Sequence, residues 1–370
     1  MITMRAAVLE QQNQPLAIRD DVEIRDPGPG QVRVKVSSCG ICHSDLSVID
    51  GAFPSPTPIV LGHEAAGVVE SVGANVRGVE PGDHVVLTPC PPCGRCYWCV
   101  RNEHSHCELS MGLLTHAFPD GSTGLSRGGQ TLLRGLNVGG FAEYALHSET
   151  GVVRVPKDAP LDVVCVIGCA VQTGVGAVLN TARVVPGASV LVVGCGGVGL
   201  SAILGARLVA ATPIIAVDLV DEKRALALQL GATHALDPAN GDIREQVRAL
   251  TEGRGVRYAF EAIGRSDTIE AAYESLEHGG TMTVVGQVPD GVRISLDPYA
   301  MSDFEFTLTG SNYGSANPAV DFPRLLAWYA SGQLDLDPLV ARRIALGDIN
   351  EAFAELATGR ATRSVIVYDA

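Results

Sequence analysis

The pattern of apolar and polar positions divides the chain into two kinds of segment. In the first 170 residues, short apolar or alternating runs are separated by Pro-Gly turns at 29–30 and 81–82. The runs at 31–38, 65–73 and 84–89 are typical of strands with one or both faces buried. This part of the chain therefore predicts antiparallel, barrel-like β structure.

From about residue 185, strand-like runs alternate with helical patterns. That alternation predicts a doubly wound parallel sheet with right-handed crossovers, an α/β fold. The expected strands are 188–193, 213–218, 257–264 and 281–286, and the helical patterns between them include 198–210 and 221–231.

The last segment, from about 313, has a helix pattern at 317–331 and a strand pattern at 364–369. That strand resembles the first part of the chain more than the middle. We therefore expect the parallel sheet to be inserted in a discontinuous β-rich domain. The expected division is 1–172 with 313–370 for the β-rich domain, and 173–312 for the inserted one.

Composition narrows the functional classes. The 370 residues are 46% apolar and carry a formal charge of −14, which argues against nucleic acid or a membrane surface as partner. The N-terminal segment lacks the apolar core of a signal peptide, and no apolar run approaches the roughly 20 residues that span a bilayer. We expect a cytoplasmic protein, in which the ten cysteines suit metal binding better than disulfides.

A dense cysteine run defines a lobe at about 90–110. Its spacing is Cys93-x2-Cys96-x2-Cys99-x7-Cys107, which lets one loop wrap four thiolates around a zinc ion. Four thiolates leave no open coordination position, so this zinc would be structural. An iron–sulfur cluster and a set of free cysteines are the alternatives. Three further residues of the lobe are set aside because four thiolates already complete a site: Cys90, His104 and His106.

Three separated residues form a weaker candidate. Cys42 lies in GICHSD, His63 in GHE, and Cys169 in VCVIGCAVQTG. Each alone is more typical of a core or surface residue. Together they supply a Cys2His ligand set, which leaves a fourth zinc position open for water or substrate.

The sequence GCGGVG at 194–199 follows a predicted strand and begins a predicted helix, the context of a dinucleotide-binding turn. Gly194 permits the tight turn, Gly196 lets backbone approach a pyrophosphate, and Gly199 allows close helix–strand packing. Asp218 ends the next strand, where its carboxylate would bind ribose hydroxyls and repel a 2′-phosphate. Leu219 follows without an adjacent arginine, so NAD is favoured over NADP.

These motifs, with a terminal GRATRS at 359–364, resemble the zinc-dependent medium-chain alcohol dehydrogenases over essentially the whole chain. The resemblance implies a Rossmann-type domain inserted in a GroES-like catalytic domain, with NAD and two zinc ions per chain. It implies oxidation of an alcohol to an aldehyde or ketone, reversibly, with hydride transfer to NAD.

The resemblance also implies roles for single residues. Cys42, His63 and Cys169 would hold the catalytic zinc, with Glu64 and Asp45 beside it, and Ser44 would receive the alcohol proton. The structural zinc would lie on the cysteine run. The implied cofactor contacts are His43, Thr173, Gly194, Gly196, Gly197, Gly199, Asp218, Lys223 and Arg363.

Two departures qualify the resemblance. Many members carry a histidine that passes the proton to solvent at the position of Ser47, so the relay here would run from a ribose hydroxyl to water. The loop before GHE has no acidic residue, unlike dehydrogenases of glutathione adducts.

The long loop at 111–137 is typical of dimeric members, which favours a homodimer over a tetramer.

Several alternatives stay open. A formaldehyde–glutathione or polyol dehydrogenase would use the same scaffold, although polyol members commonly have an acid where this chain has Cys169. A non-catalytic zinc-binding scaffold would leave the Cys2His set without a purpose. Some related bacterial enzymes hold their cofactor and need another electron acceptor. The pocket is expected to be lined by the loops 51–58 and 111–137. Their conformation does not follow from the sequence, so the sequence does not give the size of the substrate.

Overall fold

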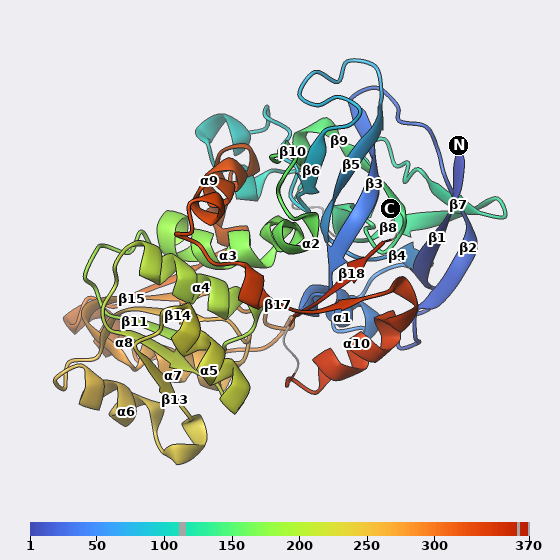
Figure 1. Ribbon diagram of the computed structural model, residues 1–370. Coiled ribbons are helices and arrows are strands. Elements are labelled where there is room, and N and C mark those ends of the chain that lie inside the picture. Colours follow the sequence, from blue (N-terminus) through green and yellow to red (C-terminus); the bar gives the residue numbers. More distant parts are fainter. Residues whose placement is uncertain (111–115, 361–362, 369–370) are drawn as a thin grey trace. The chain divides into compact units, whose positions relative to one another are not determined.

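The computed structural model describes residues 1–110, 116–360 and 363–368, which form two compact units, each discontinuous in sequence (Figure 1). The first unit comprises Met1–Cys169, Asn317–Ala327 and Leu339–Ala370. The second comprises Ala170–Ala316 and Trp328–Pro338. The helix α9 (Pro318–Ala330) contributes residues to both.

The first unit contains a closed barrel and a seven-stranded sheet, as the β-rich pattern predicts. In sheet order, the barrel strands are β1 (Ile2–Leu9), β2 (Ala17–Ile24), β7 (Leu125–Arg127), β8 (Gln130–Arg134) and β4 (Ile59–Val60). The larger sheet has the order β10 (Val152–Arg154), β6 (His84–Leu87), β5 (Glu64–Val72), β3 (Gln31–Gly40), β18 (Arg363–Val367) and β17 (Val340–Ile344), and β9 (Tyr144–Ser148) also pairs with β3.

The end of the chain returns to this larger sheet. β18 runs antiparallel to β3, with Ile366 opposite Cys39, so the expected terminal strand does belong with the first part of the chain. Three helices accompany these sheets: α1 (His43–Ile49), α2 (Leu161–Val164) and α10 (Ile349–Ala357). Apolar side chains of both sheet and helices form one core, which includes Val34, Phe141 and Phe353.

The second unit is built on a six-stranded parallel sheet, which confirms the doubly wound α/β prediction. Its order is β13 (His234–Leu236), β12 (Ile214–Val217), β11 (Val190–Val193), β14 (Val256–Glu261), β15 (Leu276–Val284) and β16 (Thr307–Gly310). Helices accompany this sheet, and neighbouring ones contact each other: α4 (Gly197–Leu208) contacts α5 (Asp221–Leu230), and α6 (Ile243–Leu250) contacts α7 (Ser266–Tyr273) (Figure 1). The unit also contains the helices α3 (Ala170–Gly176) and α8 (Pro298–Asp303).

The outer strands β13 and β16 are not evident in the apolar pattern. They are short, with three and four residues, and several of their positions are polar or exposed. Strand order reverses direction between β11 and β14, and in open parallel sheets ligands bind outside the carboxyl ends of the strands at such a point. This is where the glycine motif lies.

No single described helix is long and apolar enough to cross a membrane. Two consecutive helical segments, 161–168 and 170–181, are long and apolar enough only when taken together, and the chain bends between them. Most of their residues are buried.

His147 makes the stability of the first unit depend on pH. It lies in β9 with its Nε2 2.9 Å from the carbonyl oxygen of Thr88, while Nδ1 accepts from the amide of Ser148 at 2.8 Å. The imidazole is therefore neutral, with its proton on Nε2. Burial and the nearby Arg134 lower the pKa of His147 to about 3.

We expect this histidine to destabilise the fold in acid. The unfolded chain binds a proton near pH 6.5 and the folded chain does not, so stability falls as the pH drops below about 6.5. His147→Gln should reduce the slope of unfolding free energy against pH by up to about 1.4 kcal/mol per unit. Urea unfolding between pH 7 and pH 5 measures this slope. The exposed His278→Gln is the control, and equal slopes in all three proteins would contradict the assignment.

Candidate functional site

The structure brings the dispersed residues Cys42, His63 and Cys169 together with Glu64. One ligand atom from each lies within 4.8 Å of all the others. All four belong to the first unit, and the group is almost fully buried. The donor set, two thiols, an imidazole and a carboxylate, is one that suits zinc.

Three separate segments deliver these side chains. Cys42 is the N-cap of α1, and His63 and Glu64 lie where the chain enters β5. Cys169 ends the turn 165–168, which packs closely on β6 and β5. A side chain at Gly168 would lie 2.7 Å from the carbonyl oxygen of Leu87, so glycine permits this approach.

Asp45 orients His63. Its carboxylate is fully buried; Oδ1 accepts from the amide of Gly62 at 2.9 Å, and Oδ2 lies 3.1 Å from Nδ1 of His63. A carboxylate on Nδ1 leaves Nε2 with a lone pair to offer. Both ring nitrogens are buried without a hydrogen bond among the described residues, but Nδ1 faces the Asp45 carboxylate, so Nε2 is the nitrogen left for a metal.

Charge is concentrated in this group. The hydrogen bond from Cys169 holds the pKa of the Cys42 thiol well below its usual value and raises that of Cys169. Burial opposes protonation of His63, yet the charges of Asp45 and Cys42 raise its pKa well above the usual value. A cation in the group would satisfy both thiolates and return the imidazole to its neutral, coordinating form.

Glu64 is paired with the far end of the chain. Its Oε2 accepts from Nη1 of Arg363, and both side chains are buried. Burial raises the pKa of Glu64 to about 7 despite this cation. The carboxylate also needs the glycine at position 40, since a Cβ there would lie 2.2 Å from Oε2.

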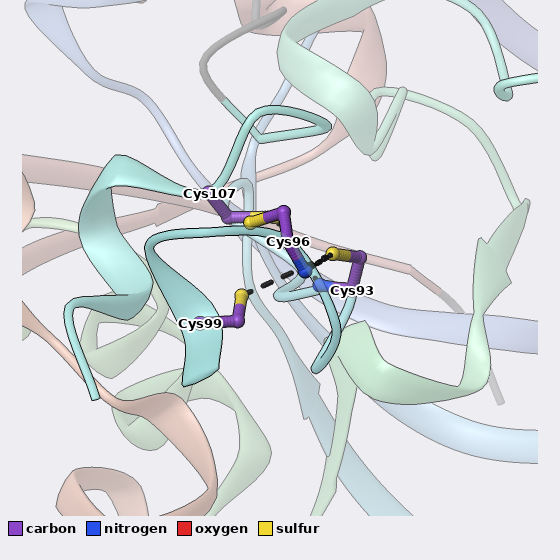
Figure 2. A group of neighbouring side chains, drawn as sticks. All are labelled: Cys93, Cys96, Cys99 and Cys107. Atoms are coloured by element: carbon purple, nitrogen blue, oxygen red, sulfur yellow. Dashed lines mark hydrogen bonds between the residues drawn. The ribbon is translucent and has the colours of Figure 1, made fainter. Parts of the chain in front are cut away.

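The cysteine run forms a second group. Cys93, Cys96, Cys99 and Cys107 converge with their sulfur atoms within 4.8 Å of one another (Figure 2). Backbone amides point at the sulfurs: those of Cys96 and Cys93 donate to Cys93 Sγ and Cys107 Sγ at 3.3 and 3.2 Å. Such bonds stabilise thiolates, and the amide of Cys99 helps to lower the pKa of Cys96 to about 6.

Cys90, His104 and His106, which the sequence analysis did not assign as ligands, lie outside this group. Cys90 is buried, and burial raises the pKa of its thiol to about 12. The exposed His106 packs its ring against Trp98, with centroids 5.4 Å apart.

The glycine motif has the geometry that each of its roles requires. Gly194 has a φ of +94°, in the region that favours glycine. A Cβ at Gly199 would lie 1.7 Å from the carbonyl oxygen of Gly194, whereas one at Gly196 would meet no atom within 4 Å. The turn is thus closed on its protein side and open where a ligand would approach, with Gly197 as the first residue of α4.

Asp218 follows β12 and is fixed by the same turn. Its Oδ2 accepts from the amide of Cys195 at 2.8 Å and its Oδ1 from that of Val220 at 2.9 Å. Sequence reasoning missed Arg224, which donates to the Asp218 carbonyl and is paired with Asp221 and Asp237. Arg224 lies one turn into α5 and belongs to no recognisable motif, so the sequence did not indicate its role.

Other expected site residues are placed without being gathered into one of these groups. His43 is exposed at the first position of α1, and Ser44 Oγ lies 4.0 Å from Cys42 Sγ. Thr173 is buried in α3, and Lys223 is half-buried in α5. Of the terminal motif at 359–364, residues 361–362 lie outside the described residues, as do 111–115 of the long loop.

Comparison with known proteins identifies the family. A model of the alcohol dehydrogenase GroES-like domain matches residues 28–157, and one named zinc-binding dehydrogenase matches residues 197–331. An NDMA-dependent alcohol dehydrogenase from Amycolatopsis methanolica is 37% identical over 369 residues, 99% of both chains. The chain belongs to the zinc-dependent medium-chain alcohol dehydrogenases.

Solved structures agree. An alcohol dehydrogenase zinc-binding domain protein from Burkholderia ambifaria is 38% identical, with a TM-score of 0.96 over the whole of both chains. Benzyl alcohol dehydrogenase from Acinetobacter calcoaceticus is 33% identical, with a TM-score of 0.95 and the same coverage. The predicted family and its two-domain fold are confirmed. This alcohol dehydrogenase therefore carries one group with four thiols and one with a mixed donor set.

The four-thiol group of this alcohol dehydrogenase should contribute stability and not turnover. We expect Cys107→Ser to lose one zinc relative to the unchanged chain and to lower the unfolding midpoint by about 5 °C or more. Zinc analysis and thermal unfolding measure both. Cys90→Ala is the matched control, since Cys90 is a buried neighbour outside the group. A Cys107→Ser protein with its full zinc content would contradict the prediction.

Proposed function

We propose that this alcohol dehydrogenase oxidises an alcohol to an aldehyde or ketone by reversible hydride transfer to NAD. Two zinc ions per chain complete the proposal: a catalytic one on Cys42, His63 and Cys169, and a structural one on the cysteine run. The observation that carries it is the buried Cys2His group, which the carboxylate of Glu64 joins as a fourth donor. Three protein ligands leave a zinc position open for an alcohol.

Zinc bound there would act as a Lewis acid that lowers the pKa of an alcohol hydroxyl toward neutrality. Ser44, whose Oγ lies 4.0 Å from Cys42 Sγ, would accept the hydroxyl proton by hydrogen bond. Asp45 would keep the proton of His63 on Nδ1, so that Nε2 stays available. Since Ser47 stands where many members have a relay histidine, the proton would continue through a ribose hydroxyl to water.

Glu64 and Arg363 would tune the charge of this site. The site holds two potential thiolates and a carboxylate, and Arg363 offsets one negative charge from within hydrogen-bond distance of Glu64. Glu64 would act beside the zinc or as an occasional ligand. Losing the Arg363 cation would remove a buried positive charge that compensates the Glu64 carboxylate, which is costly.

The second unit would bind NAD at the carboxyl edge of its parallel sheet. The turn Gly194–Gly199 and the start of α4 supply the open backbone amides that suit a pyrophosphate. Asp218, whose carboxylate is held by two backbone amides, would accept from ribose hydroxyls. The remaining proposed cofactor contacts are His43, Thr173, Gly197, Lys223 and Arg363.

The proposal extends to organisation and location. The catalytic domain would comprise 1–172 and 313–370 with the zinc lobe at about 90–110, and the NAD-binding domain 173–312. A homodimer is favoured over a tetramer; β16 is the last strand of its sheet within the described part of the chain, and a second copy would add its own strand at this edge. None of the ten cysteines, all of which lie in the described residues, forms a disulfide, which suits the cytoplasm.

Two relatives suggest finer alternatives. One acts on benzyl alcohol by its name, which makes aromatic alcohols the first substrates to test. Another is NDMA-dependent, so an assay with added NAD alone could miss turnover. A glutathione-adduct dehydrogenase is less favoured, because the loop before His63 lacks an acidic residue, and Cys169 argues against a polyol dehydrogenase.

The proposed reaction is tested by absorbance at 340 nm with NAD and a panel of primary, secondary and aromatic alcohols, each with and without NDMA. We expect alcohol-dependent reduction of NAD, and two zinc ions per chain. Cys169→Ser should lower kcat by at least about 100-fold while NADH binding, followed by fluorescence, is retained. Full activity of that variant with one zinc per chain would sink the assignment.

Asp218 should set the choice between NAD and NADP. Asp218→Gly removes the carboxylate that would repel a 2′-phosphate, so we expect the ratio of kcat/KM for NAD over NADP to fall by about tenfold or more. Glu222→Gln, an exposed acid in α5, is the control. An unchanged ratio in Asp218→Gly would count against Asp218 as the selector.

A further inference from the structure

Arg134 is a buried arginine with no acidic partner among the described residues. It ends β8 and is 3% exposed. Its guanidinium lies over the ring of Phe118, with Cζ 3.9 Å from the centroid.

A cation in this position is costly. Burial and the nearby Arg25 lower the pKa of Arg134 to about 9, so the guanidinium is still charged at neutral pH. Its Nε is buried and has no hydrogen-bond partner among the described residues.

The guanidinium holds a strained turn. Nη1 donates to the carbonyl of Asn137, and also to that of Leu146 at 3.4 Å. Leu136 has a φ of +48° and Asn137 a φ of +65°, and both are buried. Two consecutive left-handed residues that are not glycine persist only where their surroundings hold them.

A neutral histidine holds the same turn from the other side. Nδ1 of His116 accepts from the amide of Leu136 at 3.4 Å, and its Nε2 lies 3.3 Å from Oγ of Ser55. The backbone carbonyl of His116 accepts from the amide of Arg134 at 2.9 Å. The turn is thus fixed through Leu136 N by His116 and through Asn137 O by Arg134.

The chain after this turn leads directly to the mixed donor group. The amides of Gly140 and Phe141 donate to the carbonyls of Gly62 and Leu61 at 2.7 and 2.9 Å. The approach is close, since a Cβ at Gly62 would lie 2.5 Å from the Phe141 ring. Gly62 in turn donates to Asp45 and precedes His63.

We propose that Arg134 is a positioning residue: it fixes the Leu136–Asn137 turn, and through that turn the Leu61–His63 segment at the catalytic group. The inference rests on the proposed function in that it takes Cys42, His63 and Cys169 as metal ligands. Arg134 does not touch the metal or the alcohol. It sets where the imidazole and the backbone beside it stand.

The test compares Arg134→Met and Arg134→Lys with the unchanged chain, each loaded with cobalt in place of zinc. Arg127→Met is the matched control, because Arg127 lies in the same barrel but is paired with Glu10 and Asp21. Cobalt-loaded Cys169→Ser serves as the reference: the visible absorption bands that it lacks are those of cobalt at the catalytic site. Further readouts are the thermal midpoint, NADH affinity, and kcat and KM over several alcohols.

We expect Arg134→Met to shift the catalytic-site bands and to lower kcat/KM by about tenfold, unequally among alcohols. NADH affinity should stay within about twofold, and the cysteine-run bands should not change. Arg134→Lys keeps the charge but not the planar contact with Phe118, so its values should be intermediate; it also serves if Arg134→Met does not fold.

A purely structural role would lower the thermal midpoint alone. If bands and kcat/KM of the folded variants match those of Arg127→Met, the inference is wrong while the proposed function stands. A wild-type chain that binds a single cobalt ion would overturn the proposed metal site, and the inference with it.

Discussion

The candidate catalytic group depends on one buried carboxylate, that of Asp45. Its two oxygens bind two different parts of the chain entering β5: the amide of Gly62 and the imidazole of His63. Asp45 itself lies in the first turn of the helix that Cys42 caps. One side chain therefore fixes the distance between two donors and the direction of the imidazole. An uncompensated carboxylate there would be expensive, so its presence requires both partners to stay in place.

A second buried pair closes the group from the other end of the sequence. Arg363 begins β18, and its guanidinium meets Glu64 beside His63. A buried ion pair contributes little net stability, because desolvation offsets most of the attraction, but removing one of its members is strongly destabilising. The pair thus contributes more to the position of β18 against β3 than to the free energy of unfolding. This gives a physical reason for the pairing of β18 with β3 in the first unit, although the two strands lie far apart in the sequence.

Local signals in the sequence predicted much of the fold, and long-range ones did not. The glycine turn at Gly194–Gly199 and the cysteine run are encoded by spacing within a few residues, and the structure shows the geometry that each spacing implies. The residue types made Cys42, His63 and Cys169 a weak candidate set, and the family resemblance strengthened it; no local spacing could show their convergence, since more than a hundred residues separate the first from the last. The buried partners Arg363 with Glu64, and the turn held by Arg134, carry no local pattern. Short edge strands such as β16 escaped notice because few of their residues are apolar and buried.

The two cysteine-containing groups differ in the completeness of their donor sets. Four thiols supplied by one lobe can satisfy a tetrahedral ion without help from the rest of the chain, which leaves no position for a substrate. The mixed group takes its donors from three segments, so its geometry follows every shift in the sheet and turns that carry them. Such a group needs rigid support beyond its direct hydrogen bonds. The unpaired Arg134 and the left-handed residues Leu136 and Asn137 have the character of that support, because each is costly where it stands and each leads, through backbone hydrogen bonds, to the segment that ends in His63.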